Sequence, residues 1–341
     1  MSRFVLTKNE ISDKINKNLT ESDILILLYI TTAVVLTVTV ASIIIANVIF
    51  SLCFTRAKDP EGNVEKGILH IEKNGGNGAA IREGREWMLS QNVEHHYITS
   101  RDGLRLHGIL IPNPNTDKKR MAVLVHGYQG SPAFDFSAAA RYYYSNGFAL
   151  FLPDQRTHGE SEGKYITFGA FERYDVVDWC KYLDEYTSHQ YEFILSGVSM
   201  GATTVLLAAA EPDMIKLNYI TADCGFTDPA RIFTHVFKQW YHLPTFPILN
   251  FARSVCKNKA KFSFDEFSTT QAVKNLCAPV TFIHGEADDF VTPDNSIDNY
   301  NECTSEKQLV TVPDAAHGVS YIKDPIGVQR ELQRIFDNYF S

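Results

Sequence analysis

The chain has 341 residues, 45% of them hydrophobic and 21% charged, which is ordinary for a globular protein with a substantial core. Its formal net charge of −8 argues against nucleic acid as the main partner, because nucleic-acid-binding surfaces are rich in Lys and Arg. The six cysteines are scattered and no two form a C-x-x-C pair, so the sequence indicates neither a zinc site of that type nor a disulfide framework.

An uncharged run follows the polar residues 1–23, since no charged side chain occurs from residue 24 to residue 55. A helix from Ile24 to Phe50 would be roughly 40 Å long, and the hydrocarbon core of a bilayer is about 30 Å thick. A cleaved signal peptide fits less well, because the run is too long and the preceding segment is neither short nor net positive. A buried core helix is the other alternative. We predict that residues 24–55 form a single transmembrane anchor.

The orientation of this anchor stays open. Basic residues occur at similar density on both sides of it, so the positive-inside rule does not choose a side for the main domain. They are Arg3, Lys8, Lys14 and Lys17 before the run, and Arg56, Lys58, Lys66 and Lys73 after it.

The polar stretch 56–78 is predicted to be a linker, because it ends in the turn-rich sequence Asn74-Gly75-Gly76-Asn77-Gly78. A helix is expected at about residues 79–90. Two strand-like runs, 94–100 and 104–112, flank an Asp-Gly pair and are predicted to form a hairpin.

From there to the end of the chain, short apolar runs alternate with amphipathic helical segments. This alternation predicts an α/β domain over residues 79–341, with a mostly parallel sheet and helices on both faces. Ligands bind such sheets at the carboxyl ends of the strands, so chemistry is expected in the loops that follow each run. The further predicted strands are 121–126, 149–153, 193–196, 219–223, 280–284 and 309–312.

The sequence Gly197-Val198-Ser199-Met200-Gly201 is a candidate nucleophile site. A branched and aromatic run precedes it and an Ala- and Leu-rich run follows it, so this G-x-S-x-G motif joins a buried strand to a helix. Such a turn raises a serine hydroxyl above the edge of the sheet. Glycines at both ends let the strand and the helix approach closely.

An oxyanion hole is expected beside Ser199. Free backbone N–H groups are available in the Gly-rich turn after strand 121–126 and in the first turn of the helix after Ser199. The candidate donors are the N–H groups of Tyr128 and Met200. One such donor is typically worth on the order of a hundred- to a thousandfold in rate.

Two later strand ends supply a base and an acid. Serine needs a base to take its proton, and His317 follows the last predicted strand. Asp288 follows strand 280–284 and is predicted to orient the imidazole and stabilise the imidazolium. Asp289 and Asp223 are the competing carboxylates.

The loop 154–163 is also polar, but a catalytic role is not predicted for it. Asp154 and Arg156 are expected to hold the loop in place, and His158 is expected at a turn position because a glycine follows it.

In their order along the chain these motifs resemble the α/β-hydrolase superfamily, most of all its bacterial, often membrane-anchored branch of esterase- and serine-aminopeptidase-like hydrolases. The resemblance covers about residues 94–341 and implies an α/β-hydrolase fold. It also implies Ser199 as nucleophile, Asp288 as acid and His317 as base, with Tyr128 and Met200 as oxyanion donors. It rests on His126-Gly127-Tyr128, loop 154–163, Gly197–Gly201, His284-Gly285-x-x-Asp288-x-x-Val291 and Ala316-His317.

Residues 225–278 form an aromatic-rich segment that is longer than one crossover helix needs. In related hydrolases such an insertion is a small helical cap that lines the acyl or alcohol pocket. The resemblance therefore implies that Trp240, Tyr241 and Phe246 line the substrate pocket. Ordinary helix packing is the alternative reading of these rings.

The expected function is hydrolysis of small to medium carboxylic esters through an acyl-enzyme, by a chain tethered to a lipid bilayer. A serine peptidase for short peptides and a non-catalytic membrane-bound module of the same fold are the alternatives. No cofactor and no metal are expected. The adjacent pair His95-His96 lies on a predicted strand, so its side chains should point to opposite faces. The oligomeric state and the acyl and alcohol groups stay open.

Overall fold

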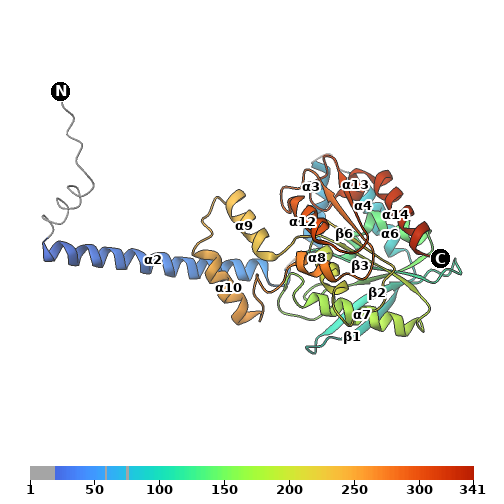
Figure 1. Cartoon of the computed structure of the whole chain (residues 1–341), viewed down its shortest axis with the longest axis horizontal. Coiled ribbons are helices and arrows are strands. Elements are labelled where there is room, and N and C mark those ends of the chain that lie inside the picture. Colours follow the sequence, from blue (N-terminus) through green and yellow to red (C-terminus); the bar gives the residue numbers. More distant parts are fainter. Residues whose placement is uncertain (1–19, 58–59, 74–76) are drawn as a thin grey trace, which may run out of the picture.

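A single eight-stranded sheet, in the order β1-β2-β4-β3-β5-β6-β7-β8, is the centre of the computed structural model, which describes residues 20–57, 60–73 and 77–341 (Figure 1). The strands are β1 (Glu94–Thr99), β2 (Arg105–Ile111), β3 (Arg120–Val125), β4 (Phe148–Pro153), β5 (Glu192–Val198), β6 (Tyr219–Asp223), β7 (Val280–Gly285) and β8 (Lys307–Val312). Strands β3 to β8 pair in parallel, which confirms the predicted mostly parallel sheet.

The hairpin β1–β2 forms one edge of the sheet, and β2 also pairs antiparallel with β4. At its turn Gly103 has a φ of +88°, which a residue with a Cβ adopts only with strain. The N–H of Ser100 donates to the carbonyl of Leu104 at 2.8 Å and closes the hairpin. The predicted Asp-Gly hairpin is confirmed.

Helices cover both faces of the sheet, as predicted. One face buries Phe151 against Trp179 beneath α7 (Glu172–Tyr186), α8 (Met200–Ala209) and α12 (Asp294–Glu302). The other face buries Phe148 against Phe336 beneath α4 (Gly78–Leu89), α6 (Ser137–Ser145) and α14 (Pro325–Tyr339). The short elements are α5 (Pro132–Asp135), α11 (Thr269–Ala272), the 3-10 turn Val273–Asn275 and α13 (Ser320–Lys323).

The helix α2 (Glu21–Cys53) projects from the domain (Figure 1). Thr20 caps its N-terminus in a reciprocal pair with Asp23. Its 33 residues correspond to about 50 Å. Within the part of the chain that the structure describes, it is the one helix long and apolar enough to cross a membrane.

The last turns of α2 pack on protein instead of projecting freely. Ser42, Ala46 and Phe50, each four residues from the next, are buried in this region. The contacting helix is α10 (Ile248–Lys259), and Lys259 Nζ donates to Asn47 Oδ1 at 2.9 Å. The uncharged run therefore ends in a contact between helices, which its composition alone does not reveal.

Helices α9 (Pro229–Gln239) and α10 lie within the segment that the sequence predicts to be a small cap, and we call these two helices and their connection the cap. They lie beside the domain end of α2 (Figure 1). Phe54, just after α2, stacks on Phe233 and Phe264 from the cap segment. The aromatic residues of the insertion thus serve to fasten α2 to the domain.

Within the stretch 56–78, which the sequence predicts to be a linker, the structure has helix α3 (Pro60–Lys73). Ile68 is buried against Ile81 of α4, and the backbone of Gly67 lies against the ring of Phe134. Helix α3 contacts the domain through a few apolar residues. Its many charged residues make this short apolar pattern hard to recognise in the sequence.

We predict that Gly201→Ala destabilises the fold. A Cβ at residue 201 would lie 2.0 Å from the carbonyl oxygen of Val125, so helix α8 would have to move away from β3. Overpacking of this kind costs about 1–3 kcal/mol or more. Urea unfolding of the full chain in detergent should show a lower midpoint. Ser145→Ala, at the exposed end of α6, is the control, and an unchanged Gly201→Ala midpoint would contradict the close approach.

Candidate active site

Ser199 lies at the turn between β5 and α8, with φ 55° and ψ −118°. A non-glycine residue reaches this conformation only with strain, and such strain is concentrated at functional sites. The turn is tight because a Cβ at Gly197 would lie 2.3 Å from the carbonyl oxygen of Gly201. The structure thus has the strand–turn–helix geometry that the flanking residues predict.

The structure brings the three predicted catalytic residues into one chain of hydrogen bonds. His317 Nδ1 lies 2.7 Å from Asp288 Oδ2, and His317 Nε2 lies 2.8 Å from Ser199 Oγ. Since a carboxylate only accepts, Nδ1 carries the proton and Nε2 accepts from the serine hydroxyl. Asp288 is in the loop after β7 and His317 in the loop after β8, so both come from the carboxyl ends of parallel strands.

The competing carboxylates are placed elsewhere. Asp289 is exposed, and its backbone carbonyl accepts from the ring of His235 at 2.7 Å. Asp223 accepts from the hydroxyl of Ser320 at 2.9 Å. Neither carboxylate is hydrogen-bonded to His317, so the geometry favours Asp288.

Asp288 stays ionised because its surroundings donate to it. Burial opposes its charge, but hydrogen bonds from His284 and His317 outweigh burial and lower the pKa of Asp288 to about 2. The N–H groups of Phe290 and Val291 also donate to its other oxygen, at 3.0 and 2.9 Å. At neutral pH the side chain is therefore a fixed anion facing the imidazole.

The oxyanion candidates lie beside Ser199 with free donors. A Cβ added to Gly127 would lie 3.3 Å from the Cβ of Ser199, so this turn passes directly over the nucleophile. The N–H of Gly127 donates to Asp135 at 2.7 Å and the N–H of Gln129 donates to a histidine ring at 3.1 Å. Tyr128, between them, and Met200, at the start of α8, have no acceptor for their N–H groups among the described residues.

Asp135 is a site residue that the sequence analysis missed. Its carboxylate holds the turn that carries Tyr128, through the N–H of Gly127. Burial raises the pKa of Asp135 to about 6, although the Gly127 N–H and the nearby His317 oppose the rise. The residue ends the four-residue helix α5, and no motif in the sequence marks it.

The loop 154–163 supports the same turn from the other side. Asp154 accepts from His107 at 2.7 Å, and Arg156 donates to both Asp175 and Asp102. His158 is buried, and its Nε2 accepts the N–H of Gln129. The expectation that this loop is held by Asp154 and Arg156 is confirmed, and His158 helps to hold the oxyanion turn.

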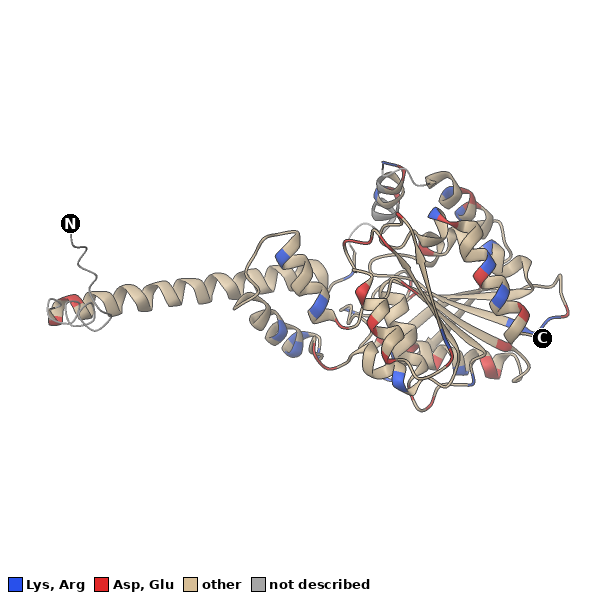
Figure 2. Ribbon diagram, turned by 45° about the horizontal axis from the view of Figure 1, so that its top comes forward, with Lys and Arg blue, Asp and Glu red and all other residues tan. Residues whose placement is uncertain are grey.

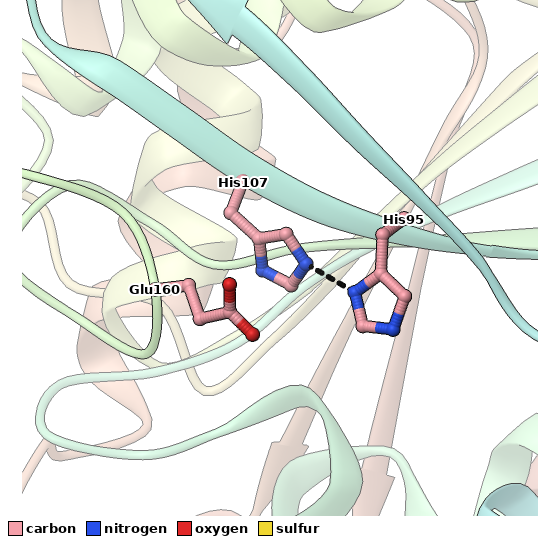
Figure 3. A group of neighbouring side chains, drawn as sticks. All are labelled: His95, His107 and Glu160. Carbon is pink, nitrogen blue, oxygen red and sulfur yellow. Dashed lines mark hydrogen bonds between the residues drawn. The ribbon is translucent and has the colours of Figure 1, made fainter.

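His95, His107 and Glu160 form a group whose donor atoms lie within 4.8 Å of one another (Figure 3). His107 donates to Asp154, so its Nε2 accepts from His95 Nδ1 at 2.9 Å. Two nitrogens on a tetrahedral zinc would be about 3.3 Å apart, so a hydrogen bond describes this pair better. His96 points the other way, to Tyr182, as the strand alternation predicts. A second such group, Cys224, Asp288 and His317, shares two residues with the hydrogen-bond chain.

A cavity of about 420 Å³ opens at Ser199 and His317. Its walls are mainly apolar, and helix α3 contributes to them from the stretch predicted to be a linker. The lining includes Lys66, Gly67, Ile71, Ile81, Phe134, Asp135, Val198, Val319 and Ile322.

Trp240, Tyr241 and Phe246, which were expected to line the substrate pocket, are not among the residues that line this cavity. All three are exposed. The ring of Trp240 packs on Phe290, and Phe290 separates it from His317. The physical reason is that the cap packs on α2, which leaves the mouth of the cavity to α3, α5 and α13.

Comparison with known proteins relates part of the chain to a hydrolase family. A family model described as serine aminopeptidase, S33, matches residues 116–245. YqkD, an uncharacterised Bacillus subtilis protein, is 28% identical over 192 residues, which cover 56% of this chain and 63% of that protein. The chain thus spans somewhat less than two thirds of the curated relative it matches.

Solved structures give the same fold. Esterase Pf2001 of Pyrococcus furiosus has a TM-score of 0.61 and 19% identity, covering 75% of this chain and 94% of that chain. Est1E of Butyrivibrio proteoclasticus, solved with ferulic acid, has a TM-score of 0.57 and 19% identity, covering 71% of this chain and 100% of that chain. An acylaminoacyl peptidase has a TM-score of 0.54 and 17% identity, covering 73% of this chain and 42% of that chain. These likenesses show that the chain has the α/β-hydrolase fold.

We predict that Asp288→Asn lowers kcat on a p-nitrophenyl ester by on the order of a thousand- to ten-thousandfold, because an amide can present an N–H to His317 and favour the wrong tautomer. Asp289→Asn is the matched control and should stay within about threefold, since its side chain is exposed. If Asp289→Asn lowered kcat more than Asp288→Asn does, Asp289 and not Asp288 would be the acid.

A second prediction concerns the pH dependence of stability. The carboxyl of Asp135 has a pKa near 3.8 when unperturbed and about 6 in the fold, so the unfolded chain loses this proton first as the pH rises. The free energy of unfolding of the wild type should therefore fall relative to Asp135→Asn between about pH 4 and pH 6. Urea unfolding at several pH values measures the difference. If the difference in free energy of unfolding between the wild type and Asp135→Asn did not change with pH, the raised pKa of Asp135 would be contradicted.

Proposed function

We propose that the chain is a serine hydrolase that cleaves carboxylic esters of small to medium size through an acyl-enzyme, and that α2 tethers it to a bilayer. One observation carries the proposal: Ser199, His317 and Asp288 form a continuous hydrogen-bond chain at a strained turn. Beside that turn lie the two free N–H groups of Tyr128 and Met200.

The proposed reaction follows from these contacts. Ser199 Oγ attacks the ester carbonyl while His317 Nε2 takes the hydroxyl proton, and Asp288 stabilises the imidazolium. The carbonyl oxygen becomes an anion that accepts from the N–H groups of Tyr128 and Met200. The C–O bond then breaks, and His317 returns the proton to the leaving alcohol. Water attacks the acyl-enzyme with the same proton transfers and releases the acid.

The lining of the cavity favours esters over peptides with a free amino terminus. An aminopeptidase needs a carboxylate to hold the substrate ammonium. Among the described residues that line this cavity, Asp135 is the one with a carboxylate. This carboxylate already accepts a hydrogen bond from the N–H of Gly127. Lys66 at the rim would also repel a cation. A neutral acyl group suits the remaining apolar wall.

The tether is supported by the burial pattern of α2. From Glu21 to Ala41 its side chains are almost all exposed although most are apolar. An isolated apolar helix of this kind is unfavourable in water and stable in hydrocarbon. The side of the membrane on which the domain lies is left open by this pattern.

The test is labelling of the full chain in detergent with a fluorophosphonate probe. Wild type and Ser145→Ala should label, whereas Ser199→Ala should not label and His317→Ala should label far more slowly. Labelling that survives in Ser199→Ala would contradict the nucleophile. If no variant labels, the non-catalytic module gains support. The rates of hydrolysis of short-chain aryl esters and of aminoacyl amides then distinguish an esterase from a peptidase. Faster cleavage of the amides would contradict the ester proposal.

A further inference from the structure

The loop between α9 and α10 exposes a group of large apolar side chains. Trp240, Tyr241, Leu243 and Phe246 are 49%, 65%, 40% and 75% exposed, although they lie within seven consecutive residues. Folded proteins seldom leave so many large apolar side chains together in water unless the surface contacts something. We call these four side chains the apolar loop.

The backbone that carries the apolar loop lies on the side of the cap toward the free length of α2. In both ribbon views the connection between α9 and α10 forms the edge of the cap nearest the projecting part of that helix (Figures 1 and 2). Its position is fixed because α10 packs on Ala46 and Phe50 and because Lys259 is hydrogen-bonded to Asn47. The level of the cap along α2 is therefore set by direct contacts.

That level coincides with the expected boundary of a bilayer. The free apolar length from Ile24 to Ala41 is about 27 Å long as a helix, close to the hydrocarbon thickness of about 30 Å. The first buried residue of α2 is Ser42. A bilayer that surrounds the free length would thus end where the cap begins.

The charges of the cap suit a membrane surface. Lys257, near the end of α10, and Lys261, just after it, are exposed, and neither forms an ion pair with a described residue. Lys259, between them, is held by Asn47. Figure 2 shows the basic residues of α10 on the domain side of the loop. In membrane proteins, aromatic residues gather at the membrane interface and lysines lie further out, near anionic headgroups. The aromatic residues and the lysines of the cap follow the same order.

We propose that the cap is a second membrane contact, in which the apolar loop inserts into the interfacial layer of the bilayer and Lys257 and Lys261 meet anionic headgroups. The proposal rests on the tether by α2 proposed above. With two contacts, the helix and the loop, the catalytic domain is held at a fixed height and tilt, whereas a helix with a flexible linker would let it rotate.

The test uses the full chain in vesicles of phosphatidylcholine and phosphatidylglycerol. The chain has three tryptophans, so the difference between wild type and Trp240→Phe isolates the emission of Trp240. Lipids brominated near the headgroup should remove about half of that emission, because interfacial tryptophans lie at this depth. Aqueous iodide should quench it little.

A matched control places a tryptophan on the opposite side. Ile326 is 68% exposed and belongs to α14, a helix on the side of the domain away from α2 (Figure 1). In the Trp240→Phe background, Ile326→Trp should be quenched by iodide and not by brominated lipid.

Flotation separates the two proposals. Wild type that does not float with vesicles would overturn the tether and the second contact with it. Wild type that floats while Trp240 is quenched by iodide and not by brominated lipid would overturn the second contact alone. Replacing Lys257 and Lys261 by glutamine, with Lys259 kept because it holds the cap on Asn47, should reduce the quenching by brominated lipid in anionic vesicles more than in neutral ones. Equal quenching in both would contradict the role of these two lysines.

Discussion

The close contact between helix α8 and the sheet is the constraint on which the site depends. Gly201 lies against the carbonyl of Val125, and Gly197 lies against the carbonyl of Gly201, with no room for a Cβ at either residue. This contact forces Ser199 into its strained conformation and places the N-terminus of α8 beside it. One turn of backbone therefore places three groups together: the Ser199 hydroxyl, the Met200 N–H and the positive end of the helix dipole.

The other half of the site is held by polar side chains that do not touch a substrate. Asp135 and His158 fix the N–H groups on either side of Tyr128, and Asp154 and Arg156 fix the loop that carries His158. These groups are largely buried, so each one is costly unless it is satisfied. Their shared effect is to hold in place the turn that carries the N–H of Tyr128, the proposed oxyanion donor.

The sequence predicts the parts of the fold that short patterns encode. Strand ends, the Asp-Gly hairpin and the order of Ser199, Asp288 and His317 depend on local residue types, and the structure reproduces the predicted sheet and brings these three residues together. Asp135 could not be predicted, because its role arises from one contact with Gly127 across a turn. Helix α3 was hidden by its charges, and its part in the cavity depends on packing between segments.

The cap shows a different limit of sequence analysis. Aromatic content indicates an insertion, but the same rings can line a pocket or pack against another helix. Here Phe233 and Phe264 pack on Phe54, and Trp240 and Phe246 remain exposed. Which outcome occurs is decided by the apolar face of α2, whose last turns pack on α10.

The central claim is that Ser199 forms an acyl-enzyme, and intact-mass analysis of an acid-quenched reaction tests it most directly. With p-nitrophenyl acetate, the full chain should gain the mass of one acetyl group, and peptide mapping should locate it on Ser199. The Asp288→Asn and His317→Ala variants should gain it much more slowly. An acetyl group on another residue, or rapid product release with no acetyl on Ser199 at any quench time, would contradict the account.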